Sequence, residues 1–182
     1  VYGKTTNIYG NLYITNSIPP LPWISTTISE ISVQSHTVST QYTDPVALFD
    51  NTYNNYFYFW DYLNQWIIVN LNNFYNLTKL RVYKSVEVNN KHWGVFYIQY
   101  YNSNNQWTRF TDIFNVTEAE WALLSTGQYK EFTINNTNIC LNKYRILIER
   151  SCDSLNLRWP VTSEVKLFGA VGSKAPEEDV QI

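Results

Sequence analysis

The stretch Gln65-Trp66-Ile67-Ile68-Val69-Asn70-Leu71 decides the fold. Its β-branched and aromatic residues predict a buried strand that begins at the tryptophan. A second strand with clean alternation, Lys79–Lys84, follows after the short connector Asn73–Thr78. Two strands this close in sequence indicate an antiparallel pair.

The rest of the chain continues the strand pattern. Aromatic segments flank the turn Asn102-Ser103-Asn104-Asn105, which is typical of a hairpin. Three later segments also predict strands: Tyr129–Ile134, Tyr144–Glu149 and Glu164–Phe168. Only Thr117–Ser125 looks helical, because Thr117 and Glu120 form a capping box ahead of an apolar run. Strands separated by turn-rich loops, with one short helix, predict a single all-β sandwich.

A chain of 182 residues is long enough to bury a core without disulfides. Period-2 placement predicts these core residues: Trp66, Ile68, Leu80, Val82, Ile98, Trp107, Ile146, Ile148 and Leu167. We expect the sandwich to span Ile24–Val171, preceded by an extended lead-in strand and Pro-rich linker at Val1–Trp23. Residues Gly172–Ile182 are expected to form an acidic tail or linker. Because the chain has no methionine, we expect it to be part of a longer protein.

Composition argues against several classes of function. The net charge of −2 provides no basic field, so nucleic acid is a poor candidate partner. No apolar run approaches the roughly 18 residues of a transmembrane segment. The chain has two histidines, no glycine-rich phosphate loop and no Cys/His cluster, so we do not expect an enzyme. Its 7 Trp, 15 Tyr and 9 Phe exceed the needs of one core, and we expect some of them to be exposed.

The two cysteines flank one predicted strand. An extended strand rises about 3.3 Å per residue, which holds Cys140 and Cys152 well over 20 Å apart. A disulfide requires Cα atoms within about 7 Å of each other. We therefore expect two free, buried thiols.

Several motifs in consecutive order resemble the discoidin-like domains, also called coagulation factor 5/8 type C domains or family 32 carbohydrate-binding modules. They are the turn Ala47-Leu48-Phe49-Asp50-Asn51, the strand Gln65–Leu71, the hairpin Phe96–Trp107 and the closing segment Ser163–Gly169. The resemblance implies a galactose-binding-like jelly-roll β-sandwich. The chain departs from the family pattern with Asn51 for a glycine, Asn70 for an aspartate, and a longer Asn/Tyr insertion before Trp66.

The resemblance also implies a structural Ca²⁺. In the family, the turn Asp and the Glu of the closing strand hold the ion, and these positions match Asp50 and Glu164, with Asn55 in place of the family's turn threonine. Oxygen ligands at short spacing suit a hard cation. The alternative is that Asp50 and the asparagines after it form Asx-turns and bind no metal.

A ligand site is expected on loops at one end of the sandwich, where the resemblance implies a carbohydrate site. Aromatic rings stack on sugar faces, and polar side chains bind the hydroxyls. Three loops supply such residues: His36 and Tyr42; Lys91, His92 and Trp93; and Asn156, Arg158 and Trp159. We expect these loops to border one shallow groove. The alternatives are that Trp93 caps the core and that Arg158 forms a surface ion pair.

These observations favour a non-catalytic module that binds a cell-surface or capsule glycan and attaches a larger extracellular or virion-surface assembly. The segment Gly10-Asn11-Leu12-Tyr13-Ile14-Thr15 is similar to shaft segments of viral fibres. By analogy with fibres, a homo-oligomer such as a trimer is expected. One alternative is a structural decoration protein of a capsid or tail that contacts protein rather than glycan. Another is lipid binding through aromatic loop tips.

Overall fold

The computed structural model describes residues 23–53, 55–102, 104–135, 139–153, 155–156 and 158–174. The predicted lead-in segment before Trp23 and the tail after Lys174 lie outside the described residues and stay predictions. In the described part of the chain, no helix is long and apolar enough to cross a membrane.

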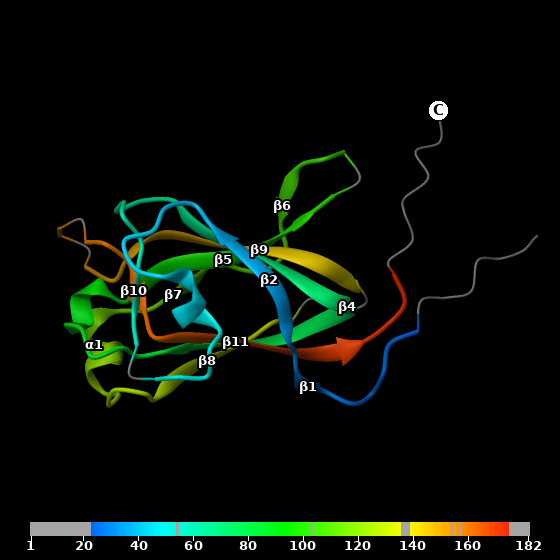
Figure 1. Ribbon diagram of the computed structural model, residues 1–182, viewed down its shortest axis with the longest axis horizontal. Coiled ribbons are helices and arrows are strands. Elements are labelled where there is room, and N and C mark those ends of the chain that lie inside the picture. The colour runs from blue at the N-terminus through cyan, green and yellow to red at the C-terminus, as the bar shows by residue number, and fades with distance from the viewer. Residues whose placement is uncertain are drawn as a thin grey trace, which may run out of the picture.

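The described residues form a β-sandwich with one short α-helix (Figure 1). The strands are β1 (Ser29–Glu30), β2 (Val33–Val38), β3 (Phe57–Tyr58), β4 (Gln65–Tyr83), β5 (Trp93–Tyr101), β6 (Trp107–Arg109), β7 (Phe114–Asn115), β8 (Tyr129–Thr133), β9 (Leu141–Ser151), β10 (Val161–Thr162) and β11 (Glu164–Val171). The helices are α1 (Glu118–Ala122) and the 3₁₀ turns η1 (Pro45–Leu48) and η2 (Asn89–Lys91). The predicted all-β sandwich is confirmed.

Strand β4 is continuous over 19 residues and belongs to both layers. Its first part, from Gln65 to Leu71, pairs with β2 and β9. After a register irregularity between Asn70 and Tyr75, its second part pairs with β11 and β8. The predicted antiparallel pair of short strands is therefore wrong, because the supposed connector Asn73–Thr78 remains extended and carries the chain from one layer to the other.

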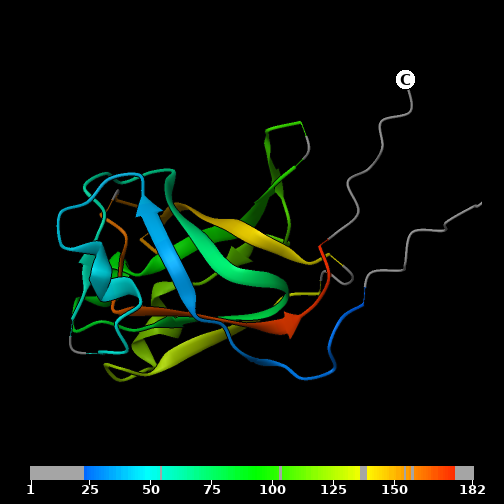
Figure 2. The same ribbon diagram turned by 45° about the vertical axis from the view of Figure 1, so that its right-hand side comes forward.

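The two layers meet along β4. One layer has the order β2, β4, β9, β5, β6, and the other has the order β1, β11, β4, β8. Figure 2 shows β2 and β9 on one side of the sandwich and β11 and β8 on the other. A separate pair of short strands, β10 and β3, covers one end. Both described chain ends lie at the other end, where Ser173 N–H donates to Trp23 O over 2.9 Å (Figure 1).

The core lies between the layers. Along β4, the residues that face the core are shifted by one position from the predicted ones. Ile67 and Val69 are buried, whereas Trp66 and Ile68 are only half-buried. The register explains this, since Ile67 faces Ile146, which is itself in the core. The core placement predicted for Trp66, Ile68 and Trp107 is wrong, and it is confirmed for Leu80, Val82, Ile98, Ile146, Ile148 and Leu167.

The local predictions hold. Glu120 N–H donates to Thr117 Oγ1, and Thr117 N–H donates to Glu120 Oε2 over 2.8 Å, so the capping box forms as expected. The hairpin places Tyr101 opposite Trp107. Both cysteines are free and buried, as predicted.

His92 lies beneath α1, against Trp121, with its ring fully buried. Ser85 N–H donates to His92 Nε2 over 3.1 Å, so the proton of the neutral ring sits on Nδ1, facing Asn89 O at 3.2 Å. Burial lowers the pKa of His92 to about 4, because the charged ring would be desolvated and Lys84 lies nearby. The ring is therefore neutral in the folded protein at neutral pH.

Substitution of two adjacent residues tests the phase of β4. Ile67→Ala should lower the free energy of unfolding by about 2–5 kcal/mol, because it empties core volume. Ile68→Ala should cost less than half as much, because that side chain faces outwards. Urea unfolding of the two variants measures both values, and equal losses would contradict the register.

The burial of His92 predicts a pH dependence. The unfolded chain takes up a proton near pH 6.5 and the folded one near pH 4, so stability falls as the pH drops through this window. The loss should be on the order of 3 kcal/mol and absent from His92→Gln. Urea titrations at pH 7 and pH 4 measure how much unfolding free energy each protein loses between the two pH values. Equal losses in wild type and His92→Gln would show that His92 does not cause the pH dependence.

Candidate functional site

One end of the sandwich gathers aromatic rings from three separate segments. We call Tyr42, Tyr58, Trp60, Tyr62 and Trp159 the aromatic cluster. Trp159 is its centre, with ring centroids 5.6 Å from Trp60, 5.7 Å from Tyr42 and 6.0 Å from Tyr62. The rings of Trp60 and Tyr62 lie nearly parallel to that of Trp159, at 20° and 21°.

Backbone hydrogen bonds hold the three segments together. Tyr42 N–H donates to Tyr58 O over 3.0 Å, which joins the segment after β2 to β3. Trp60 N–H donates to Thr40 Oγ1 over 3.0 Å, and Phe59 N–H donates to Pro160 O over 3.3 Å. The cluster is therefore fixed by main-chain contacts between loops rather than by ring stacking alone.

Much of the cluster remains open to solvent. Tyr42 is 57% exposed, Trp60 is 56% exposed and Tyr62 is 40% exposed, while Trp159 is half-buried under its neighbours. Exposed aromatic rings gathered at one place are unusual on a soluble domain and indicate a binding surface. The cluster lies at the end that carries β3 and β10, away from the described chain ends (Figure 1).

Polar groups lie beside the rings. Lys91 Nζ is 3.1 Å from the Tyr58 hydroxyl and 3.1 Å from Glu87 Oε2. Arg158 precedes Trp159, is exposed, and contacts Asp153 at 3.5 Å, which is the surface ion pair considered as an alternative. Asn156 is exposed as well, and its N–H donates to Asp153 Oδ1. Of the predicted ligand residues, Tyr42 and Trp159 thus belong to the cluster, and Lys91 lies beside its member Tyr58. Asn156 and Arg158 lie on the loop that leads to Trp159.

The other predicted residues lie elsewhere. Trp93 and His92 are fully buried, so the expectation of a surface position is wrong for both, and the alternative that Trp93 belongs to the core is confirmed. His36 lies on β2, where Nε2 is 2.9 Å from Pro45 O and the ring packs on Phe49. Its register partner is the buried Val69, so His36 faces the sandwich interior rather than the cluster.

Trp60 and Tyr62 were not among the site residues predicted from the sequence. Both lie in the Asn/Tyr insertion before β4, where six of the seven residues from position 56 to position 62 are aromatic. That density was the available signal. Alternation gave no guidance there, because the segment is mostly loop and mixes the buried Phe57 and Phe59 with the exposed Trp60 and Tyr62.

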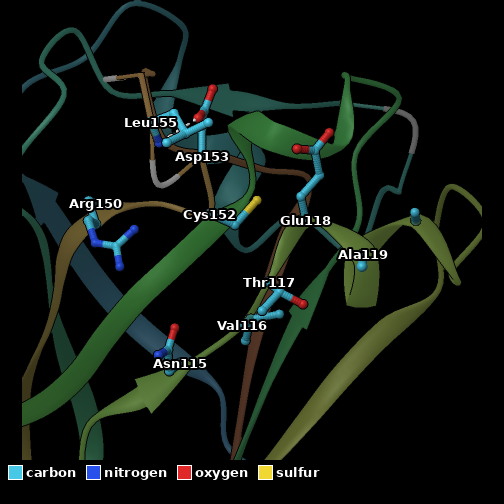
Figure 3. A pocket seen from close by; sticks show the side chains of 10 residues that line it. Asn115, Val116, Thr117, Glu118, Ala119, Arg150, Cys152, Asp153 and Leu155 are labelled. Carbon is cyan, nitrogen blue, oxygen red and sulfur yellow. Dashed lines mark hydrogen bonds between the residues drawn. The ribbon is translucent and has the colours of Figure 1, made fainter.

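A surface hollow of about 730 Å³ lies between the start of α1 and the segment after β9 (Figure 3). It is lined by Thr117, Glu118, Arg150, Cys152 and Asp153 among others. Cys152 Sγ contacts Asn89 O at 2.9 Å, and burial raises the pKa of the thiol to about 12. The thiol is protonated at neutral pH, which makes it a poor nucleophile and a poor metal ligand.

The predicted cation residues approach one another. Glu164 is 2% exposed, its Oε2 has no hydrogen-bond partner among the described residues, and burial together with the charge of Asp50 raises its pKa to about 8. Asp50 Oδ1 accepts from Thr52 N–H over 2.8 Å, which is an Asx-turn, and Asp50 Oδ2 accepts from Asn55 Nδ2 over 3.0 Å. Asn51 has φ 61°, a left-handed conformation that asparagine tolerates, which explains its presence at the usual glycine position.

No protein-family model matches the sequence, and no curated protein matches it. Solved structures do match. A family 32 carbohydrate-binding module of Clostridium perfringens NanJ in complex with galactose aligns with a TM-score of 0.60 and 15% identity, covering 78% of this chain and 99% of that one. A module from the same organism in complex with GalNAc-β-1,3-galactose aligns with a TM-score of 0.58 and 12% identity, over 76% of this chain and 99% of that one.

A third module from Clostridium perfringens, from a family 31 glycoside hydrolase, aligns with a TM-score of 0.58 and 20% identity, over 82% of this chain and 95% of that one. Identities this low establish likeness of fold. The coverage is nearly complete on the side of each module, so the likeness extends over the whole sandwich rather than over a shared fragment. The chain has the galactose-binding-like β-sandwich fold of the family 32 carbohydrate-binding modules.

Proposed function

We propose that this chain is a non-catalytic carbohydrate-binding module whose ligand stacks on the aromatic cluster. The observation that carries the proposal is the gathering of Tyr42, Trp60 and Tyr62, each at least 40% exposed, around Trp159. The C–H face of a pyranose is apolar enough to pack on such rings. The fold shared with carbohydrate-binding modules supports the same conclusion.

Polar groups near the rings would orient the sugar. Arg158 and Asn156 are exposed on the loop leading to Trp159, where their N–H groups can donate to hydroxyls. Lys91 adds a cation beside Tyr58. One stacked ring with one charge-assisted hydrogen bond contributes on the order of 2–4 kcal/mol, so a single site binds weakly. Useful attachment then requires several copies.

We further propose that the module serves a larger extracellular or virion-surface assembly, such as a homo-oligomeric fibre. The arrangement of the ends supports this context. Trp23 and Ser173 are hydrogen-bonded to each other at the end away from the aromatic cluster. Chain leaving the sandwich at that end would hold the cluster outwards, towards a cell-surface or capsule glycan.

Replacement of Trp60 tests the aromatic cluster. Trp60→Ala should weaken glycan binding about tenfold or more, because it removes an exposed stacking face. Trp23→Ala is the matched control, since Trp23 is 60% exposed but lies at the opposite end. A glycan array followed by titration of the best ligand measures both variants, and equal binding by Trp60→Ala and wild type would refute the site.

A decoration protein that contacts other proteins through the same rings is the competing function. It predicts no ligand on the glycan array but loss of assembly in Trp60→Ala. Lipid binding through the rings would instead appear as co-sedimentation with phosphatidylcholine vesicles.

We also propose a Ca²⁺ near Asp50 and Glu164, with the side-chain oxygen of Asn55 as a further candidate ligand. The buried, unpartnered Glu164 Oε2 supports this, because a cation would satisfy the oxygen and offset the repulsion from Asp50. Within the described ranges, no three His, Cys, Asp or Glu residues are grouped so that they could hold a metal ion, so amide and backbone oxygens would have to complete the coordination.

Calcium should therefore raise the melting temperature. At 100-fold excess over Kd, binding to the folded state stabilises it by about 2.7 kcal/mol. EDTA should reverse the effect, and Glu164→Gln should abolish it. Differential scanning calorimetry with and without Ca²⁺ measures the melting temperature. Identical wild-type curves would contradict the Ca²⁺ site and favour the alternative, in which Asp50 forms an Asx-turn and binds no metal.

A further inference from the structure

The outer face of the first layer carries a second set of aromatic and basic residues. On β9, Lys143 and Arg145 alternate with the core residues Tyr144 and Ile146 and therefore point outwards. The register places Arg145 beside Ile68 of β4 and Gln99 of β5. The half-buried side chains predicted for the core, Trp66 and Ile68, belong to this same face.

The hairpin of β5 and β6 stands up beside this face (Figures 1 and 2). It places Tyr101 and Trp107 against the basic residues. Lys143 Nζ lies 5.2 Å from the centroid of the Tyr101 ring and 5.8 Å from that of Trp107. Arg145 Cζ lies 4.6 Å from the Trp107 ring, and its Nε donates to Gln99 Oε1 over 2.7 Å. The contacts fix both cations beside aromatic rings without neutralising them.

No carboxylate of a described residue lies within ion-pairing distance of Lys143, Arg145 or the neighbouring Arg109. Arg109 shares the register partner Gln99 with Arg145 and is exposed. Six of the other basic side chains pair with acids: Lys79, Arg81, Lys91, Lys130, Arg158 and Lys166. Lys84 instead donates to the backbone carbonyls of Trp121 and Leu124, and Arg150 has no ion pair with a described residue. The protein as a whole is acidic, so three unpaired cations on one face require an explanation.

We propose that this face is a second binding surface, which takes an acidic saccharide bearing carboxylate or sulfate groups. The acid groups would pair with Lys143, Arg145 and Arg109, while the sugar ring packs on Trp107 and Tyr101. The surface is separate from the aromatic cluster. Lys143 and Arg145 belong to the half of β9 nearer Leu141, whereas the cluster adjoins the other end, where Glu149 O accepts from Asn64 N–H.

Charge complementarity favours an acidic saccharide over a nucleic acid. Nucleic acid binding draws on a long-range basic field, which a net charge of −2 does not supply. Three cations and two rings instead match one or two acidic sugar residues. The amide of Asn70, across from Lys143 on β4, adds a neutral group for hydroxyls.

The test measures binding of polygalacturonate and dextran sulfate to wild type and variants, with uncharged dextran as reference, by affinity electrophoresis. Lys143→Gln should weaken binding of at least one acidic polymer about tenfold, and Trp107→Ala should weaken it as well. Lys79→Gln changes the net charge equally but lies in the other layer, and it should bind within twofold of wild type. Added salt should reduce the wild-type affinity.

Three results would overturn the proposal: no binding of either acidic polymer, equal losses in Lys143→Gln and Lys79→Gln, or oligo(dT) binding as tight as that of the acidic polymers and lost in Lys143→Gln. The last would indicate a nucleic acid surface. Trp60→Ala separates the two sites, because it should leave binding to the acidic polymers unchanged. Melting curves of the variants confirm that each one folds.

Discussion

The continuity of β4 constrains the rest of the molecule. Its first part hydrogen-bonds to β2 and β9 and its second part to β11 and β8, so one strand fixes the relative position of both layers. A strand that passes between sheets must bend, and the register irregularity between Asn70 and Tyr75 supplies the bend. Ile67, in the first part of β4, and Leu80, in the second part, therefore lie in one core between the two layers.

The same strand anchors the proposed recognition end. Gln65, its first residue, is buried and accepts hydrogen bonds from Ser39 and Thr40, the residues that begin the segment carrying Tyr42. Thr40 Oγ1 also accepts from Trp60 N–H. The exposed rings thus rest on a chain of contacts that ends in the sheet, which keeps them ordered in the absence of a ligand and lowers the entropy cost of binding.

Local signals in the sequence were sufficient for the capping box, the Asn-rich hairpin and the strands of the second half, because each depends on neighbouring residues. The phase of β4 was not predictable in this way. Trp66 and Ile68 are apolar and alternate correctly, yet Ile67 and Val69 alternate as well, and only pairing with β9 decides which pair is buried. Trp60 and Tyr62 lay in a loop without periodicity, and their meeting with Trp159, almost a hundred residues away, depends on the topology.

The most direct test of the account is an NMR titration that follows the indole N–H signals of the tryptophans while galactose, and then the best array ligand, is added. The account predicts that the signals of Trp60 and Trp159 shift with saturation, because the ligand stacks on their cluster. Those of the buried Trp93 and Trp121 should stay in place. Shifts confined to tryptophans outside the cluster, or none with a glycan that binds, would contradict it.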